Sequence, residues 1–310
     1  MSIALTFPGQ GSQSVGMLGE LAAAEPDIRQ TFDQASDALG YDLWRVCSED
    51  PDQTLASTEV TQPALLTASV ALWRLWQARG GEAPTIMAGH SLGEYSALTC
   101  AGALAFDDAL TLVRERGRLM QGAVPAGVGA MAAIIGLDDD VVIAACKAVA
   151  GGQVTAANFN APGQVVIAGE SKAVDMAIEH CNEAGARRAL PLAVSVPSHS
   201  PLMSAMRAPF SEALAALSVT APTIPVVNNV DVVVTSDPDE IRDALIRQLD
   251  HSVQWSACVR KMVAAGATDF VECGPGKVLG GLLRRIHKPA NAHSIDTPDG
   301  LQKALAALTV

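Results

Sequence analysis

The sequence predicts an α/β protein in which a large domain with a parallel sheet carries a smaller inserted domain of βαββαβ order. Three observations support this fold class. Short apolar runs of strand length alternate with longer segments of helical spacing along the 310 residues. One such run leads into a G-x-S-x-G motif, which is typical of a sharp turn from a strand into a helix. The sequence pattern then changes between residues 124 and 196, where the expected strands are short and two of them form a hairpin.

The chain opens with a continuously apolar strand over residues 3–7, followed by the glycine-rich loop 8–13. Gln10 lies in this loop between two glycines, which let the backbone come close to a ligand. Ligands of open α/β sheets collect at the carboxyl ends of strands, so this loop is placed to line a site. Helices are expected over residues 15–39, with an interruption at Pro26, and over residues 63–79.

The G-x-S-x-G motif spans Gly89 to Gly93, between an apolar strand and a helix-compatible segment. A serine hydroxyl attacks a carbonyl only if it stands clear of the backbone, and flanking glycines permit the strained turn that this requires. Ser91 is therefore the candidate nucleophile. The amide of Leu92 at the helix start is placed to stabilise a developing oxyanion. By itself the motif also fits a tight turn in an ordinary α/β domain.

A helix over residues 106–121 follows, carrying Arg114, Arg116 and Arg118. The inserted segment then has a strand over 130–136 and a helix opened by three aspartates at 138–140. Two hairpin strands over 154–158 and 164–168, a helix over 171–184 and a strand over 186–192 follow. This is the order of a ferredoxin-like unit. We expect residues 124–196 to form the small domain, and residues 1–123 and 197–310 to form the large one. A cleft between the two would be a natural binding site.

His199 lies between Pro197 and Pro201, where the chain returns to the large domain. A histidine held in a short loop by prolines is a candidate base, although a surface loop histidine has the same pattern. The remaining expected elements are a helix over 201–217, a strand over 226–229, helices over 239–249 and 255–264, a strand over 269–273 and a helix ending at Arg285.

Composition excludes several classes of protein. No apolar run approaches the ~20 residues of a membrane span, and no basic leader precedes the first strand, so we expect a cytoplasmic protein without membrane attachment. A net charge of -12 and a pI near 4.9 argue against nucleic acid as a partner. The six cysteines have no C-x-x-C pair and no metal-ligand spacing, so we expect buried thiols and no metal site.

With these residues in view, the sequence resembles the malonyl-CoA:acyl carrier protein transacylases of bacterial fatty acid synthesis. The resemblance covers essentially the whole chain through FPGQGSQ, GHSLGEYSAL, RERGRLM, NFNAPGQVVIAG, VPSHS, PVVNNVDV and ECGPGKVL, in this order. It implies an α/β-hydrolase-like large domain with an inserted ferredoxin-like domain. It also implies transfer of a malonyl group from coenzyme A to the phosphopantetheine thiol of acyl carrier protein, without a permanently bound cofactor. We expect a monomer that meets its carrier transiently.

The resemblance also implies roles for single residues. Ser91 would hold the acyl group as an ester, and His199 would take the proton of its hydroxyl. Arg116 would pair with the free carboxylate of the substrate, which acetyl-CoA lacks.

Four further residues are implied to support these three. Gln10 and the amide of Leu92 would form the oxyanion hole. The backbone carbonyl of Gln248 would orient the histidine, in place of the acid of a triad. Asn160 would have a supporting role on the small-domain wall of the pocket.

Other functions remain open at the level of the sequence. A serine esterase or thioesterase could draw Asp296 or Asp299 into a triad with His287 or His293. A stand-alone polyketide acyltransferase and a non-catalytic carrier-docking module are further alternatives. Arg116 and the Gln10 loop favour the transferase.

Docking of an acidic carrier to this acidic chain would need a local basic surface. The candidates are Arg187, Arg188, Arg284, Arg285 and Lys288. Electrostatic steering of this kind is expected to weaken with salt.

Overall fold

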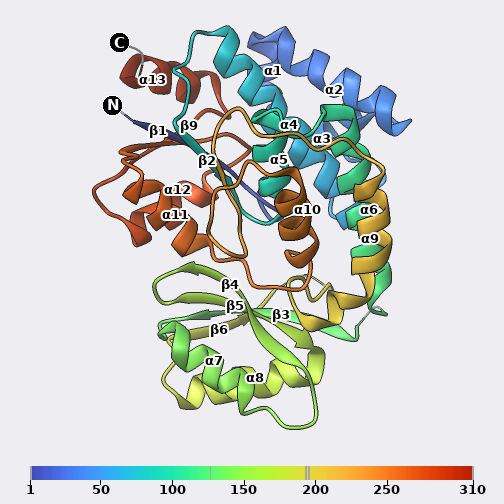
Figure 1. Cartoon of the computed structure of the whole chain (residues 1–310), viewed down its shortest axis with the longest axis vertical. Coiled ribbons are helices and arrows are strands. Elements are labelled where there is room, and N and C mark those ends of the chain that lie inside the picture. Colours follow the sequence, from blue (N-terminus) through green and yellow to red (C-terminus); the bar gives the residue numbers. More distant parts are fainter. Residues whose placement is uncertain (1, 126, 193, 195, 309–310) are drawn as a thin grey trace.

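The computed structural model describes residues 2–125, 127–192, 194 and 196–308. Figure 1 shows two parts, with a parallel sheet and most of the helices above and an antiparallel sheet below. Within the described residues the parallel sheet has five strands in the order β7-β2-β1-β8-β9. These strands are β1 (Ile3–Phe7), β2 (Ile86–Gly89), β7 (Val226–Val227), β8 (Asp269–Glu272) and β9 (Asn291–Ser294).

Both faces of the parallel sheet are buried along β1, β2 and β7, which explains why these strands are almost entirely apolar. Ile3, Leu5 and Phe7 of β1 face one core, and Ala4, between Ile3 and Leu5, faces a second core. The second core is closed by α11 (Trp255–Ala264) and α12 (Val278–Ile286). The first is covered by α1 (Gly19–Ala24), α2 (Pro26–Leu39), α3 (Leu43–Ser48), α4 (Thr58–Ala78), α5 (Leu92–Cys100), α6 (Phe106–Ala123), η1 (Pro201–Met206), α9 (Arg207–Ala215), α10 (Pro238–Arg247) and α13 (Pro298–Leu308).

The antiparallel sheet has the order β4-β5-β3-β6. Its elements follow in the chain as β3 (Gly129–Ile135), α7 (Asp139–Lys147), β4 (Val154–Ala161), β5 (Gln164–Glu170), α8 (Ser171–Glu183) and β6 (Arg188–Pro191). The two helices cover the face that points away from the parallel sheet (Figure 1). Ala132 and Ile134 of β3 pack against them, whereas Met131 belongs to a small cluster separate from that helix-covered core. Strand alternation thus presents Met131 toward the rest of the molecule.

A short seam joins the two parts beside the carboxyl ends of the parallel strands. The amide of Phe159 donates to the carbonyl of Val253 at 2.9 Å, and the amide of Val253 donates to the carbonyl of Ala157 at 2.8 Å. The hydroxyl of Ser252 also donates to the carbonyl of Ala156 at 2.6 Å. Strand β4 is therefore tied to the segment that follows α10.

The structure differs from the sequence-based expectation in the bounds of two helical segments and in three elements that were not expected. Helix α4 begins at Thr58, before Pro63, because burial of most of its side chains outweighs the one backbone hydrogen bond that a proline removes. The expected helix over 201–217 is a 3-10 turn followed by the shorter α9. Strand β9 and helices α3 and α13 were not expected. The residues of β9 are polar or small and largely half-exposed, so no apolar strand pattern marks them.

None of the helices in the described part of the chain combines the length and apolar content that a bilayer-spanning segment needs. All six cysteines are buried and unpaired. The two expected domain crossings include Ala126, Ala193 and Ser195, which lie outside the described residues.

Candidate active site

Ser91 occupies a strained turn between β2 and α5. Its backbone angles are φ 52° and ψ -106°, which a residue with a side chain rarely adopts. A Cβ atom on Gly89 would lie 1.8 Å from the carbonyl carbon of Gly93, and one on Gly93 would lie 2.0 Å from the carbonyl oxygen of Phe7. Only glycine fits at both positions, and together they let the helix start directly against the sheet.

Asn229, in the loop after β7, holds this turn from the neighbouring strand. Its side-chain oxygen accepts a hydrogen bond from the amide of Ser91 at 2.7 Å, and its side-chain nitrogen donates to the carbonyl of Gly89 at 2.7 Å. The strained backbone is thereby held at two points, the carbonyl of Gly89 and the amide of Ser91.

His199 contacts the serine hydroxyl directly. Its Nε2 lies 2.7 Å from Oγ of Ser91, and its Nδ1 lies 2.7 Å from the backbone carbonyl of Gln248. A carbonyl can only accept, so Nδ1 carries the proton of the neutral ring and Nε2 is free to accept from the hydroxyl. His199 is 3% exposed, so the interpretation as a surface histidine is wrong.

The surroundings of His199 keep its ring neutral. Burial, followed by the positive charge of Arg116, lowers the pKa of His199 from 6.5 to about 3. Because the folded-state pKa of His199 lies below the unfolded-state value, the unfolded chain takes up the proton first as the pH falls. The free energy of unfolding is therefore at its full value above about pH 6.5 and decreases as the pH falls toward 3.

We expect His199 to remain the neutral Nδ1–H tautomer between about pH 5 and 8, whereas a solvent-exposed imidazole titrates near 6.5. Protonation of Nε2 would place a second cation beside Arg116 in a buried site. Nitrogen-15 NMR of histidine-labelled protein measures this, with the His199 signals assigned by comparison with a His199→Gln variant. A titration midpoint near 6.5 for His199 would contradict the buried geometry.

The side chain of Arg116 extends from α6 to the hydroxyl of Ser91. Its Nη2 lies 3.3 Å from Oγ of Ser91 and 3.1 Å from the side-chain oxygen of Gln248, and its Nη1 donates to Gln62 at 2.9 Å. Its guanidinium carbon lies 5.2 Å from the centre of the Tyr95 ring. Arg116 is 2% exposed and, among the described residues, forms no ion pair. A buried guanidinium without a carboxylate beside a nucleophile fits a substrate that brings its own negative charge.

Gln10 and Leu92 reach the site because β1 and β2 are parallel neighbours, with Phe7 opposite Gly89. The loops after the two strands therefore lie side by side. The side chain of Gln10 donates to the hydroxyl of Thr58 at 3.3 Å. Leu92 is the first residue of α5, so its amide has no carbonyl acceptor within the helix.

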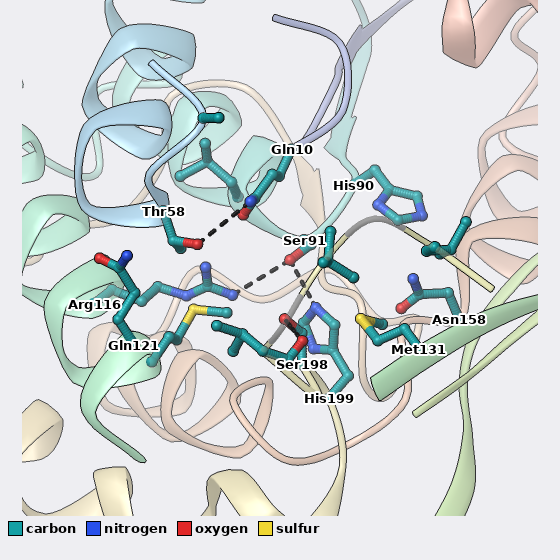
Figure 2. A pocket seen from close by; sticks show the side chains of 16 residues that line it. Gln10, Thr58, His90, Ser91, Arg116, Gln121, Met131, Asn158, Ser198 and His199 are labelled. Carbon is teal, nitrogen blue, oxygen red and sulfur yellow. Dashed lines mark hydrogen bonds between the residues drawn. The ribbon is translucent and has the colours of Figure 1, made fainter. Parts of the chain in front are cut away.

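These side chains surround one cavity of about 240 Å³, shown in Figure 2, whose lining includes Gln10, Ser91, Leu92, Arg116 and His199. The cavity has apolar walls and polar groups that converge on Ser91, which is the usual character of a small-molecule site.

Asn160 lies behind the cavity rather than on its wall. Its side-chain oxygen is 2.7 Å from Nε2 of His90, and the lining residues of the antiparallel sheet are Asn158 and Met131. The register of β4 shifts between Phe159 and Ala161, so Asn160 does not follow the regular alternation. Figure 2 shows the ring of His90 turned away from the serine hydroxyl.

The alternative triad is not assembled. His293 lies 3.3 Å from Asp269, Asp296 accepts from the amide of Gly276, and Asp299 pairs with Lys303. None of these residues lines the cavity at Ser91.

Sequence reasoning did not single out Gln62, Glu94 or Asn229, although each contacts the residues around Ser91. Glu94 and Asn229 stand inside two of the motifs that carry the resemblance, GHSLGEYSAL and PVVNNVDV. A polar residue within an otherwise apolar element was the available signal.

Comparison with known proteins agrees with this geometry. Residues 5–296 match the acyl transferase domain family. The malonyl CoA-acyl carrier protein transacylase of Escherichia coli K12 is 55% identical, over 97% of this chain and 98% of that protein. A solved malonyl-transacylase in complex with a type II PKS acyl-carrier protein is 51% identical and superposes with a TM-score of 0.98, over 99% of this chain and all (100%) of that one. An acyl carrier protein S-malonyltransferase from Vibrio cholerae is 54% identical with a TM-score of 0.96, over 98% and 99% of the two chains. The chain therefore belongs to the acyl transferase domain family, among the malonyl CoA-acyl carrier protein transacylases.

Proposed function

We propose that this chain transfers a malonyl group from coenzyme A to the phosphopantetheine thiol of an acyl carrier protein, through an ester on Ser91, in fatty acid biosynthesis. The observation that carries the proposal is the meeting of Ser91, His199 and Arg116 around one cavity. A nucleophile with its base explains acyl transfer, and the unpaired guanidinium explains an acyl group that ends in a carboxylate.

In the first half-reaction Oγ of Ser91 attacks the thioester carbonyl while Nε2 of His199 takes the hydroxyl proton. The oxygen of the tetrahedral intermediate accepts hydrogen bonds from the Leu92 amide and the Gln10 loop, each donor contributing about 3 kcal/mol. The carbon–sulfur bond then breaks, and the imidazolium returns its proton to the departing thiolate. The Gln248 carbonyl stabilises the imidazolium in the place of a triad carboxylate.

The second half-reaction reverses these steps with the thiol of the carrier. His199 takes the thiol proton, the sulfur attacks the ester carbonyl, and Oγ of Ser91 leaves with the proton restored. One oxyanion hole serves both halves because the reacting carbon occupies the same position. Arg116 holds the malonyl carboxylate throughout.

We further propose that the parallel and antiparallel sheets are an α/β-hydrolase-like domain of residues 1–123 and 197–310 and a ferredoxin-like domain of residues 124–196. The strand order β4-β5-β3-β6 supports the second assignment. Arg187, Arg188, Arg284, Arg285 and Lys288 are all exposed and stay our candidates for carrier docking. A cytoplasmic monomer that needs no bound cofactor remains our expectation.

Intact-mass measurement tests the proposal. Mixed with malonyl-CoA alone, the protein is expected to gain one malonyl group and to keep it until a thiol acceptor is added, because the second half-reaction needs that thiol. Free coenzyme A should appear in a single burst. Continuous release of coenzyme A and malonate without a thiol would instead identify a thioesterase.

The identity of the carrier is a separate outcome of this test. The related transacylase that was solved with a type II PKS carrier favours polyketide carriers as the second candidate. Offering the loaded protein a fatty acid carrier and a polyketide carrier, both with phosphopantetheine attached, distinguishes the two.

A further inference from the structure

Glu94 is a buried carboxylate that the mechanism above does not use. It is 2% exposed and lies in the first turn of α5, beside the nucleophile. Its Oε2 accepts hydrogen bonds from the side-chain nitrogen of Gln248 at 2.7 Å and from the backbone amide of Asn229 at 3.0 Å. One oxygen atom thus joins the loop after β7 to the C-terminal end of α10.

Each of the two donors to Glu94 leads to a reacting group. Asn229 accepts from the amide of Ser91 with its side chain. Gln248 accepts from His199 with its backbone carbonyl, and with its side-chain oxygen it accepts from Arg116. Gln248 also donates from its side chain to the carbonyl of Ser91 at 3.1 Å.

The contacts determine how the Gln248 amide is oriented. A guanidinium can only donate and an ionised carboxylate can only accept, so the oxygen faces Arg116 and the nitrogen faces Glu94. The amide therefore links a buried anion to a buried cation without direct contact between them. The charge of Glu94 thus compensates the charge of the Arg116 guanidinium, and Arg116 keeps N–H donors free to bind the carboxylate of a substrate.

We propose that Glu94 is a positioning residue for acyl transfer. Through its hydrogen bonds with Gln248 and Asn229 it fixes the relative positions of His199, Arg116 and Ser91. It also leaves the guanidinium of Arg116 free to bind the carboxylate of the substrate. This inference rests on the proposed function. Burial raises the pKa of Glu94 to about 7, with the hydrogen bonds from Gln248 and Asn229 and the charge of Arg116 opposing that rise.

Two conservative variants of Glu94 distinguish the effect of side-chain length from the effect of charge. Glu94→Gln keeps an acceptor at the same reach and loses the charge, whereas Glu94→Asp keeps the charge and retracts the carboxylate by ~1.5 Å. Single-turnover loading of Ser91 by malonyl-CoA is followed by quenched intact-mass measurement at about pH 8, where Glu94 is ionised. We expect E94Q to load within about fivefold of the parent and E94D to load at least about tenfold more slowly, because small misplacements of reacting groups are costly.

Glu272 supplies the matched control. It is also 2% exposed, and it accepts from the amides of Leu279 and Gly280 away from the cavity. Glu272→Asp is expected to lower the melting temperature while leaving the loading rate unchanged. Comparison of E94D with this variant separates positioning from general stability.

A double-mutant cycle tests the route through Gln248. Gln248→Ala removes the side-chain amide and leaves the backbone carbonyl. The loading rate of the E94D variant that also carries Gln248→Ala should therefore fall by less than the product of the two single effects. Equal loading by E94D and the parent, E94Q as slow as E94D, or fully multiplicative effects would each overturn the inference. Parent protein that never loads would instead overturn the proposed function.

Discussion

A Ser91→Ala variant is expected to gain no mass from malonyl-CoA and to lose transfer by at least about 10⁴-fold. Among the described residues that line the cavity, Ser91 has its hydroxyl within hydrogen-bond distance of both His199 and Arg116, so it is the group placed to form the ester. Alanine keeps the Cβ atom, so the strained turn is no worse than in the parent. The melting temperature should stay within about 3 °C.

Ser96 provides the control on the same helix. It is fully buried, and its hydroxyl has no hydrogen-bond partner within the described residues. Ser96→Ala is therefore expected to load normally and to be at least as stable as the parent, since it removes a buried unpaired polar group. Stoichiometric loading of Ser91→Ala would mean that another residue carries the acyl group.

Replacement of Arg116 by alanine should remove most of the preference for malonyl over acetyl groups. Two parallel charge-assisted hydrogen bonds to the malonyl carboxylate are lost, so the ratio of kcat/KM for malonyl-CoA to that for acetyl-CoA should fall by about 10²-fold or more. Acetyl transfer should change much less. A ratio is the right measurement here because the fraction of folded protein cancels from it.

Arg118 is the matched control for this prediction, because it lies on the same helix, is exposed and pairs with Glu115. Arg118→Ala should leave the ratio unchanged. An equal fall in malonyl and acetyl transfer by Arg116→Ala would show that the guanidinium serves the nucleophile rather than the choice of substrate.

The sequence predicted the parts of the site that depend on local geometry. Gly89 and Gly93 mark the turn because their spacing reflects the close contact between the end of β2 and the start of α5, which are adjacent in the chain. His199 was visible only as a histidine held between prolines, and its pairing with Ser91 depends on tertiary structure. Arg116 could be separated from Arg114 and Arg118 only by resemblance, since all three lie on one helix and burial decides between them.

The supporting contacts could not be predicted in the same way. Glu94 and Asn229 act on partners that are far away in the sequence, and no local pattern encodes such pairs. The same holds for β9, whose pairing with β8 comes from register at a sheet edge rather than from its own residues.

The seam between β4 and Val253 restricts how the molecule can admit a substrate. Val253 follows Gln248 closely in the chain, and both of its backbone groups are bonded to the smaller sheet. A hinge-like swing of that sheet would either break these bonds or drag the Gln248 carbonyl away from His199. If the seam stays intact, entry of an acyl thioester depends on side-chain adjustments at the rim of the cavity, with the two sheets held together.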